Sequence, residues 1–465
     1  MKISVLNGSP KGDQSATMQY VYYIQKKFPQ HEIKIFNVAQ QIKILEKNQE
    51  KFHSIIEEIE TSDGVIWGFP LYVMLVSSQY KRFIELITER NVEEAFKNKY
   101  TIQIATSIHF YDHTAINYIN AICNDLEMNY VGFFSAEMFD LMVKKEREKL
   151  VKFADNFFYT IENKLPTSRQ FPPIKHREFD YLPKTIDFEK EKISTKGKKV
   201  LIISDSMDNQ TNLGKMIQRL HDCFVEEIEV IDIYNIDIKG GCLGCMQCGY
   251  DNQCIYKDKD EFMEFWSKKL QSADILIVAG TIKDRYLSSR WKMVFDRSFF
   301  NGHIPTLTEK QIGFLISGPL GQIANLRQIL QAYIELQNSN LVDIITDEYE
   351  NSKEIDLLIY NFAKRLIKFS NSNYILPRTF LYVGGNKIFR DAIYGRMRFI
   401  FQADHRFYEK HGYYDFPQND KRAKRMNEKF IPLIENNEGF RKKFYSRAKD
   451  EMIKPLKSIV ADPNY

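Results

Sequence analysis

Cysteine is scarce in this chain. Long apolar runs and a large net charge, which often indicate a membrane or nucleic-acid-binding protein directly, are missing as well. Only six cysteines occur in 465 residues, which argues against the disulfide framework of a secreted protein. The absence of any run of about 18 apolar residues argues against a membrane-spanning helix. A formal net charge of +4 is small for this length and gives no electrostatic case for binding nucleic acid or a membrane.

The N-terminus leaves no room for a signal peptide, because "MKISVLNGSP" enters a strand pattern at once. We therefore expect a cytoplasmic protein, in which thiols stay reduced. In that compartment a tight group of cysteines indicates metal binding or redox chemistry.

The chain contains an internal repeat. Equivalent units open with the apolar runs "ISVLNGSP" (3–10) and "VLIISDSM" (200–207). Further along, "SSQYKRFIE" (77–85) returns as "SSRWKMVFD" (288–296), with the same Ser-Ser-x-aromatic-Lys pattern. Two matching strands and a shared pattern in the same order indicate a tandem duplication.

Each unit alternates short apolar runs with amphipathic segments, which is the pattern of βαβ units. The fold predicted is α/β, with two tandem doubly wound five-stranded parallel sheets whose ligand lies beyond the carboxyl ends of the strands. We expect the strands near 3–7, 32–37, 64–68, 100–106 and 129–134, and near 199–204, 227–233, 274–279, 311–317 and 340–345. The predicted domains are 1–165 and 198–371, joined by a proline-rich and charged linker at 166–197 and followed by a helical extension at 372–465.

The loop "LNGSPKGDQSAT" (6–17) leads from the first strand into a helix. Glycine, small hydroxyl residues and free backbone N–H groups at a helix start suit a phosphate. Ser9, Ser15 and Thr17 supply hydroxyl donors, and Lys11 supplies a positive charge. The same residues also suit a polar turn with a helix cap, and the loop is not the G-x-G-x-x-G of dinucleotide-binding proteins.

Two loops of the first unit resemble those of a known family, the flavodoxin-like NAD(P)H-dependent FMN reductases. They are the first loop and the third-strand loop "FPLYVMLVSSQYKRFIE" (69–85), and the resemblance extends over roughly 1–165 and 198–371. It implies a flavodoxin-like fold and an FMN-dependent oxidoreductase. Carried over, the phosphate contacts are Ser9, Lys11, Ser15 and Thr17, the isoalloxazine wall is Pro70, Leu71, Tyr72 and Val73, and the fourth-strand loop closes the other side with Thr106 and Ser107.

Tyr72 and His109 are the predicted catalytic residues. A flavin needs an aromatic side chain to stack on its ring, and Tyr72 supplies one. His109, like His113 nearby, would act as a proton donor or a substrate contact over the flavin. The alternative for both histidines is a hydrogen-bonded structural role at a strand end.

The second unit departs from this pattern. Its first loop, "SDSMDNQTN" (204–212), carries Asp208 where a lysine or arginine is expected. A carboxylate at that point repels a phosphate dianion. We therefore predict a degenerate flavin site in this half and one FMN per chain.

Four of the six cysteines lie in "GCLGCMQCGYDNQC" (241–254) with the spacing C-x2-C-x2-C-x5-C. Structural zinc sites more often use two separated pairs, whereas a C-x2-C-x2-C run is typical of iron–sulfur ligation. The spacing resembles that of iron–sulfur flavoproteins, which implies a [4Fe–4S] cluster. Zinc, or a loop that has lost its metal, are the alternatives. The predicted ligands are Cys242, Cys245, Cys248 and Cys254, while Cys123 and Cys223 are expected to be buried thiols.

The resemblance thus implies an iron–sulfur flavoprotein that passes electrons between a cluster, FMN and a small-molecule acceptor. Its electron donor would be ferredoxin or NAD(P)H. The alternatives are an NAD(P)H-dependent FMN, quinone or nitro reductase without a functional cluster, and a non-enzymatic electron-transfer or zinc-stapled binding protein. We expect no nucleic-acid or membrane partner, and a homodimer is one assembly open to the chain.

The basic and aromatic stretch 384–417 is predicted to be a packing helix or a lid over the redox site. Similar tails occur in some tandem flavodoxin-like proteins of anaerobes. The two halves are also expected to pair about a pseudo-two-fold axis, so that residues 242–254 of the second unit face the FMN site of the first.

Overall fold

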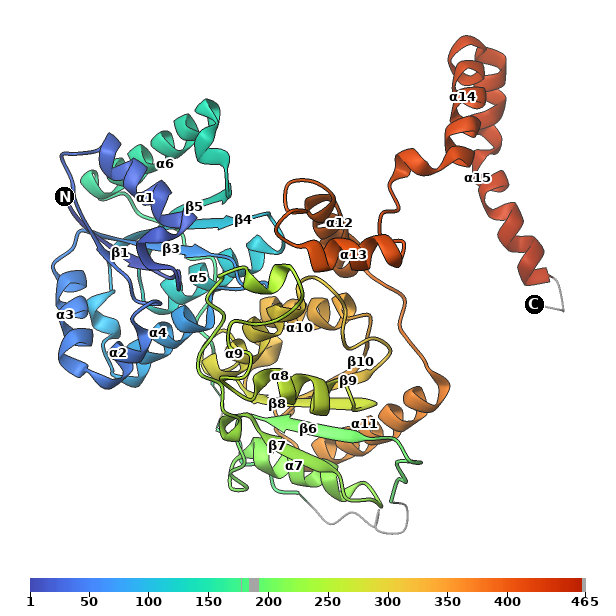
Figure 1. Cartoon of the computed structure of the whole chain (residues 1–465), viewed down its shortest axis with the longest axis horizontal. Helices are drawn as coiled ribbons and strands as arrows, with labels where there is room; N and C mark the ends of the chain where they lie inside the picture. The colour runs from blue at the N-terminus through green and yellow to red at the C-terminus, as the bar shows by residue number, and fades with distance from the viewer. Residues whose placement is uncertain (177, 184–191, 462–465) are drawn as a thin grey trace. The chain divides into compact units, whose positions relative to one another are not determined.

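The computed structural model of the chain describes residues 1–176, 178–183 and 192–461 (Figure 1). Its contacts divide the chain into two compact units, Met1–Phe407 and Tyr408–Tyr465. Both predicted sheets belong to the first unit, and the second is helical. No helix in the described ranges is long and apolar enough to cross a membrane.

The first sheet is parallel throughout, with strand order β2-β1-β3-β4-β5. Its strands are β1 (Lys2–Asn7), β2 (Glu32–Phe36), β3 (Gly64–Pro70), β4 (Tyr100–Ser107) and β5 (Asn129–Glu137). One face carries α1 (Ala16–Lys27) and α6 (Lys144–Glu162), which pack on each other. The other face carries α2 (Ile42–Lys47), α3 (Gln49–Glu60), α4 (Ser78–Glu89) and α5 (Asp112–Asp125).

The second sheet repeats this arrangement, with strand order β10-β9-β8-β6-β7 and parallel pairing. Its strands are β6 (Val200–Ser204), β7 (Glu229–Asp232), β8 (Ile275–Thr281), β9 (Gln311–Ser317) and β10 (Asn340–Thr346). One face carries α7 (Asn212–Asp222) and α11 (Ser352–Ser372). The other carries α8 (Phe262–Phe265), α9 (Ser289–Arg297) and α10 (Ala324–Leu336).

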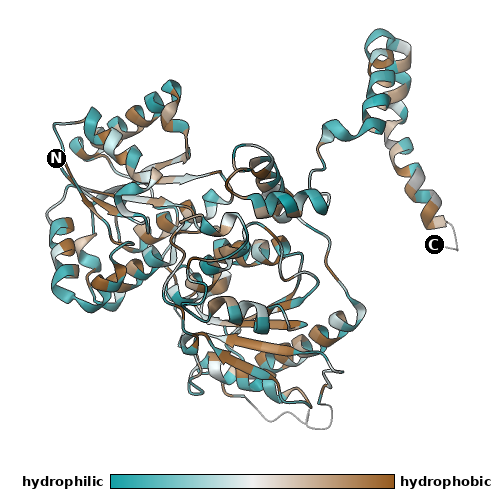
Figure 2. Cartoon of the chain, viewed as in Figure 1, coloured by the Kyte–Doolittle hydropathy of each residue, from teal (hydrophilic) through white to brown (hydrophobic). Residues whose placement is uncertain are grey.

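Counted from the start of each half, both sheets have the order 2-1-3-4-5, so the predicted doubly wound fold is confirmed. The strands of the second sheet stand out as hydrophobic in Figure 2, and the central strands of both sheets are buried because helices cover both of their faces. The order reverses beside β1 and beside β6, which places the loops after these strands at a topological switch point.

The two sheets share a core. One continuous cluster of buried side chains includes Trp67 and Ile119 of the first half together with Leu201, Trp291 and Leu326 of the second. It lies where α4 and α5 meet α9 and α10. Burial of this common apolar surface joins the halves into a single compact unit.

The predicted extension is helical. In the first unit it begins with α12 (Phe380–Tyr394), and α13 (Gln402–Lys410) crosses into the second unit, which contains α14 (Lys421–Asn436) and α15 (Glu438–Ala461). Short turns of other helix types are η1 (Gly12–Gln14), η2 (Glu93–Ala95), η3 (Asp140–Met142), η5 (Ile233–Asn235), η6 (Gln247–Gly249), η7 (Trp266–Leu270), η8 (Ser298–Asn301), η9 (Leu320–Gln322) and η10 (Pro417–Asn419).

Candidate redox site

The loop between β1 and α1 forms the predicted phosphate seat. Ser15 caps α1, since its Oγ accepts a hydrogen bond from the Met18 N–H at 3.1 Å. Ser9 Oγ accepts one from the Lys11 N–H at 3.2 Å. Each hydroxyl therefore acts as an acceptor toward the backbone and keeps its own O–H to donate to a phosphate oxygen. With the first N–H groups of α1 and the exposed Lys11 ammonium, these donors fit a phosphate.

Thr17 plays a different part from Ser9 and Ser15. Its Oγ1 shares a hydrogen bond of 2.6 Å with Thr106 Oγ1 at the end of β4. This buried contact ties the start of α1 to the fourth strand. Ser77 Oγ fixes the loop from the other side by donating to the Gly8 carbonyl at 2.9 Å. The seat is thus connected to the third- and fourth-strand loops that were predicted to enclose the flavin ring.

The predicted isoalloxazine wall ends in a tight turn. Tyr72 and Leu75 exchange both backbone hydrogen bonds, and the two residues between them, Val73 and Met74, have φ of 38° and 63°. Left-handed backbone at side chains of this size is strained by about 1–3 kcal/mol per residue and persists only when neighbours hold it. Lys292 of the second half is one such neighbour, because its Nζ donates to the Tyr72 carbonyl at 2.8 Å.

The fourth-strand loop orients His109. The His109 ring Nδ1 lies 2.9 Å from Asp112 Oδ2, which also accepts a hydrogen bond from Ser135 Oγ at 2.6 Å. Burial opposes the charge of Asp112, but the hydrogen bonds from His109 and Ser135 outweigh it and lower the pKa of this carboxyl. A half-exposed imidazole held at Nδ1 presents its other nitrogen outward. The His113 ring contacts a different residue, since its Nε2 lies 3.3 Å from the Gln328 amide.

The two halves pair through the repeated serine segments. The Ser289 N–H donates to Glu85 at 2.6 Å, and in the reciprocal position the Ser78 N–H donates to Asp296 at 2.7 Å. Helices α4 and α9, which begin at these serines, pack on each other. Reciprocal use of one patch by both partners defines an isologous, two-fold interface. These reciprocal contacts are the kind that a pseudo-two-fold pairing of the halves requires.

Buried lysines stabilise this interface. Lys81 Nζ lies 2.8 Å from Glu85 of its own helix and 2.8 Å from Asp284 of the other half, and its side chain is fully buried. Burial opposes the charge of Lys81, but Asp284 and Glu85 outweigh it and raise its pKa. Lys292 pairs with Asp296, and neither side chain is exposed. Sequence reasoning found the repeated lysines without assigning them a role.

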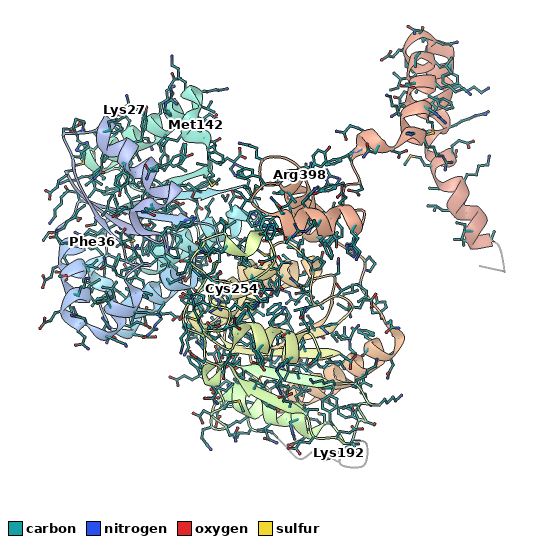
Figure 3. The ribbon with its side chains drawn as sticks, in the orientation of Figure 1. Lys27, Phe36, Met142, Lys192, Cys254 and Arg398 are labelled. Atoms are coloured by element: carbon teal, nitrogen blue, oxygen red, sulfur yellow. The ribbon has the colours of Figure 1, made fainter. Side chains whose placement is uncertain are left out.

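The cysteine loop of the second half lies across the site of the first. Gly244, between Cys242 and Cys245, has φ of 62°, and a methyl group there would overlap the Tyr72 hydroxyl and lie 3.1 Å from the Lys11 side chain. Gln79 Nε2 on α4 donates to the Cys242 carbonyl at 3.2 Å. Burial, and then the neighbouring charges of Cys242, Asp296 and Cys245, hold the pKa of Tyr72 well above its usual value. Figure 3 labels Cys254 of this loop.

The donor chemistry of this loop fits a soft metal. The Gly244 N–H donates to Cys242 Sγ at 3.4 Å, a contact of the kind that stabilises a metal-bound thiolate. Burial, and secondarily the other thiols, raise the pKa of Cys242 and Cys248 to about 12, so a metal would have to displace their protons. Across the described ranges, no three or more His, Cys, Asp or Glu side chains are gathered as a metal site. The four thiols therefore share a loop but not a common centre.

The remaining two cysteines, Cys123 and Cys223, are buried as predicted. Burial raises the pKa of Cys223 to about 11 and that of Cys123 still further. Both are inert thiols of the core.

The corresponding loop in the second half carries two aspartates, Asp205 and Asp208. Asp208 caps its own loop, with Oδ1 accepting from the Gln210 N–H at 2.9 Å, and the Asp208 carbonyl presses so closely on Gly214 that no added atom fits there. The carboxylate of Asp205 follows β6 and accepts from Ser288 Oγ at 2.6 Å. Two carboxylates stand where the first half has a glycine and a lysine, which supports the prediction of one FMN per chain.

Because Asp205 is buried, we also expect the free energy of unfolding of the chain to depend on pH. Burial raises its pKa from 3.8 to about 6, so between these values the folded chain binds more protons than the unfolded chain. The free energy of unfolding should therefore fall as the pH rises from about 4 to about 6. Asp205→Asn removes this loss and should stabilise the chain at pH 7 by about 1–2 kcal/mol, a gain that disappears near pH 4. Denaturant titrations across this range measure it.

Asp208→Asn is the matched control, because Asp208 lies exposed in the same loop. Its pH profile of stability should follow that of the unaltered chain. Parallel profiles for the Asp205→Asn and unaltered chains would show that the Asp205 carboxyl does not carry the pH dependence.

The extension packs on the fourth-strand loop. Phe389 of α12 stacks on Phe110, with ring centroids 3.9 Å apart, and Tyr111 donates its hydroxyl hydrogen to the Leu381 carbonyl. This contact requires Gly385, where a methyl group would lie 2.8 Å from the Phe110 ring. Helix α12 therefore covers the loop that carries His109. Sequence reasoning anticipated packing here but did not identify these residues.

Comparison with family models supports the fold of the first half. A family model described as a flavodoxin-like fold matches residues 1–157. No curated protein matches the chain. Solved structures that resemble it include the apo form of the NADH:FMN oxidoreductase EMOB, with 17% identity and a TM-score of 0.29 over 34% of this chain and 89% of that chain. Another is the NAD(P)H:acceptor oxidoreductase FerB from Paracoccus denitrificans, with 17% identity and a TM-score of 0.30 over 35% of this chain and 97% of that chain. A third is RosB with a bound formylated flavin phosphate, with 14% identity and a TM-score of 0.31 over 38% of this chain and 82% of that chain.

Proposed function

We propose that the chain is an FMN-dependent oxidoreductase whose single flavin binds to the first half and meets the cysteine loop of the second. The observation that carries this proposal is the close approach of Gly244 to both Tyr72 and Lys11. Because the cysteine loop contacts a residue of the proposed phosphate seat and a residue of the proposed ring wall, a bound flavin and a bound metal would be neighbours. A purely structural loop has no need of four thiols at that point.

The residues of the first half have distinct roles in this proposal. Ser9, Ser15 and Lys11 hold the phosphate, while Thr17 and Thr106 join the seat to the fourth strand. FMN, when bound, supplies one- and two-electron transfer, and the protein sets its position and electrostatics. Pro70, Leu71, Tyr72 and Val73 form the apolar wall, and Ser107, whose Oγ accepts from the His109 N–H at 2.9 Å, shapes the opposite loop.

Tyr72 and His109 have different proposed roles in hydrogen bonding and proton transfer. Because the pKa of Tyr72 is held well above its usual value, its hydroxyl stays protonated and donates a hydrogen bond without acting as a base. His109, oriented by Asp112, is the proposed proton donor or substrate contact at this edge. The two side chains come from opposite sides of the proposed flavin position.

Cys242, Cys245, Cys248 and Cys254 are the proposed ligands of a [4Fe–4S] cluster, which would supply single-electron transfer from a carrier such as ferredoxin. The second candidate function keeps the flavin and takes electrons from NAD(P)H for a quinone, a nitro compound or free flavin. The observation that favours it is that the four thiols are not gathered around a common centre.

Substitution of the phosphate seat tests the flavin site. Lys11→Glu replaces an attractive charge by a repulsive one and should weaken FMN binding about tenfold to a hundredfold, because hydrogen bonds to charged groups contribute about 1.5–3 kcal/mol. Ser9→Ala combined with Ser15→Ala should have a comparable effect. Equilibrium titration of the apoprotein with FMN, followed by quenching of flavin fluorescence, measures both.

Lys26→Glu provides the control, because it makes the same change of net charge on an exposed position of α1. Its FMN affinity should stay within about twofold of the unaltered value. If the seat variants bind FMN as tightly as the Lys26→Glu chain does, the flavin lies elsewhere and the proposal fails.

A further inference from the structure

A second concave site lies beside the redox site, formed largely by the extension. It is a cavity of about 710 Å³ in the first unit. Its side chains are mainly cationic and aromatic: Arg396, Arg398, Arg406, His405, Phe399 and Phe139. We call these residues the basic pocket. None of them has a role in the flavin site described above.

The basic pocket contains more guanidinium groups than carboxylates that pair with them. Arg396 pairs with Glu137 at 2.6 Å. Arg406 donates to the Tyr250 carbonyl and stacks over the Tyr250 ring, with 5.3 Å between the guanidinium carbon and the ring centroid. The Arg398 backbone N–H donates to the Gly395 carbonyl at 3.3 Å, but the Arg398 guanidinium forms neither a hydrogen bond nor an ion pair with any residue that the structure describes. One carboxylate thus faces three guanidinium groups, which leaves the pocket positive.

The contacts of Arg396 and Arg406 locate the pocket relative to both redox elements. Glu137 ends β5 and is the register partner of Ser107, so it lies at the same carboxyl edge of the sheet as the fourth-strand loop. Tyr250 lies within the cysteine loop, between Cys248 and Cys254. The basic pocket therefore adjoins the loop that carries His109 and the loop that carries the thiols. Figure 3 labels Arg398 on the extension.

The aromatic side chains add a second kind of contact. Phe399 is 76% exposed and Phe139 is 47% exposed, although side chains of this size are usually buried. An exposed aromatic next to the unpaired Arg398 guanidinium matches a ligand with a flat ring and an anionic group. Guanidinium binds phosphate and carboxylate in two-point geometry, and so the ligand's anion is of one of these two kinds.

We propose that the basic pocket binds a small organic anion that carries both a planar ring and a phosphate or carboxylate, and that this ligand is the reaction partner of the flavin. The second clause rests on the proposed function, whereas the binding itself does not. The pocket gives a function to the arginines of the sequence "GRMRFIFQADHRF" (395–407).

Calorimetric titration of the FMN-loaded full chain tests the proposal. The phosphate probe is 2′,5′-ADP, with adenosine as its uncharged counterpart, and the carboxylate probe is 2-naphthoate, with 2-naphthamide as its counterpart. We expect at least one charged probe to bind, and its neutral counterpart to bind at least about tenfold more weakly. Arg398→Glu should weaken the charged probe about tenfold or more, Arg398→Lys should weaken it less, and Phe399→Ala should weaken both members of the pair.

Lys152→Glu is the control, since it makes the same change of net charge on the exposed side of α6, outside the pocket. Its probe affinity should stay within about twofold. Equal binding of charged and neutral probes, or equal affinities in the Arg398→Glu and Lys152→Glu chains, would overturn the proposal. Flavin content measured in the same samples separates the two ideas: probe binding without retained FMN contradicts the proposed function alone, and FMN without probe binding contradicts the basic pocket alone.

Discussion

Replacing Lys81 by methionine is expected to lower the free energy of unfolding by about 3–5 kcal/mol, because it removes the cation that pairs with the Asp284 carboxyl and one of the two that pair with Glu85. Lys81 is the cation between Glu85 and Asp284, which come from different halves of the chain. Methionine fills a similar volume, so the loss reports the charge and not a cavity. Denaturant unfolding at pH 7, followed by tryptophan fluorescence and by circular dichroism, measures the change.

Lys97→Met is the matched control, because Lys97 is 37% exposed and pairs with the exposed carboxylates of Glu94 and Glu127. An exposed ion pair contributes about 0–1 kcal/mol, so this variant should unfold almost as the unaltered chain does. Lys292→Met at the pseudo-symmetric position should resemble Lys81→Met. If the chain with Lys81→Met is as stable as that with Lys97→Met, the buried lysines do not hold the halves together.

The second large effect concerns the cysteine loop. Substitution of Cys242, Cys245, Cys248 or Cys254 by serine, one at a time, is expected to remove most of the bound iron while leaving most of the FMN in place. In the proposed function the flavin binds to the first half, whereas the thiols belong to the second. Iron and flavin assays on anaerobically purified chains measure both losses separately.

Cys123→Ala is the control for the loss of a thiol, since Cys123 is buried in α5 far along the chain from the loop. Its iron content should equal that of the unaltered chain. Unchanged iron in all four loop variants would show that the ligands were wrongly assigned. Stoichiometric zinc in place of iron would keep the ligands and contradict the redox role.

Strand positions and sheet order could be predicted from the sequence because buried parallel strands are continuous apolar runs. The first and last residues of β1, β3 and β9 lie within two residues of the predicted strand bounds. The internal repeat strengthened these predictions, because a strand assigned in one half supports the assignment of the equivalent strand in the other. Local chemistry was equally accessible, because the Ser15 cap and the cysteine spacing depend on neighbours in the sequence.

Contacts between the halves were not accessible in the same way. The hydrogen bond from Lys292 to the Tyr72 carbonyl joins residues 220 positions apart. Nothing in the local sequence of either residue specifies that contact. The strained turn at Val73 and Met74 is equally invisible, because valine and methionine do not favour left-handed backbone. Such a turn exists only where the tertiary structure holds it.

The C-terminal extension could be predicted from the sequence only in part. Its helical character and a packing role followed from its composition, but the stacking of Phe389 on Phe110 depends on the fold of both halves. The free Arg398 and the exposed Phe399 become informative only when their surroundings are known. An arginine-rich segment alone gives no indication of the ligand.

The central claim is that one flavin of the first half and a metal bound by the second half are neighbours within a single chain. The most direct test is to purify the full chain without oxygen and to measure FMN, iron and acid-labile sulfide per chain. The account predicts one FMN with four iron and four sulfide, from the four cysteines of the 241–254 loop and the single intact phosphate seat. A chain that retains neither flavin nor metal, or one that binds two FMN without iron, would contradict it.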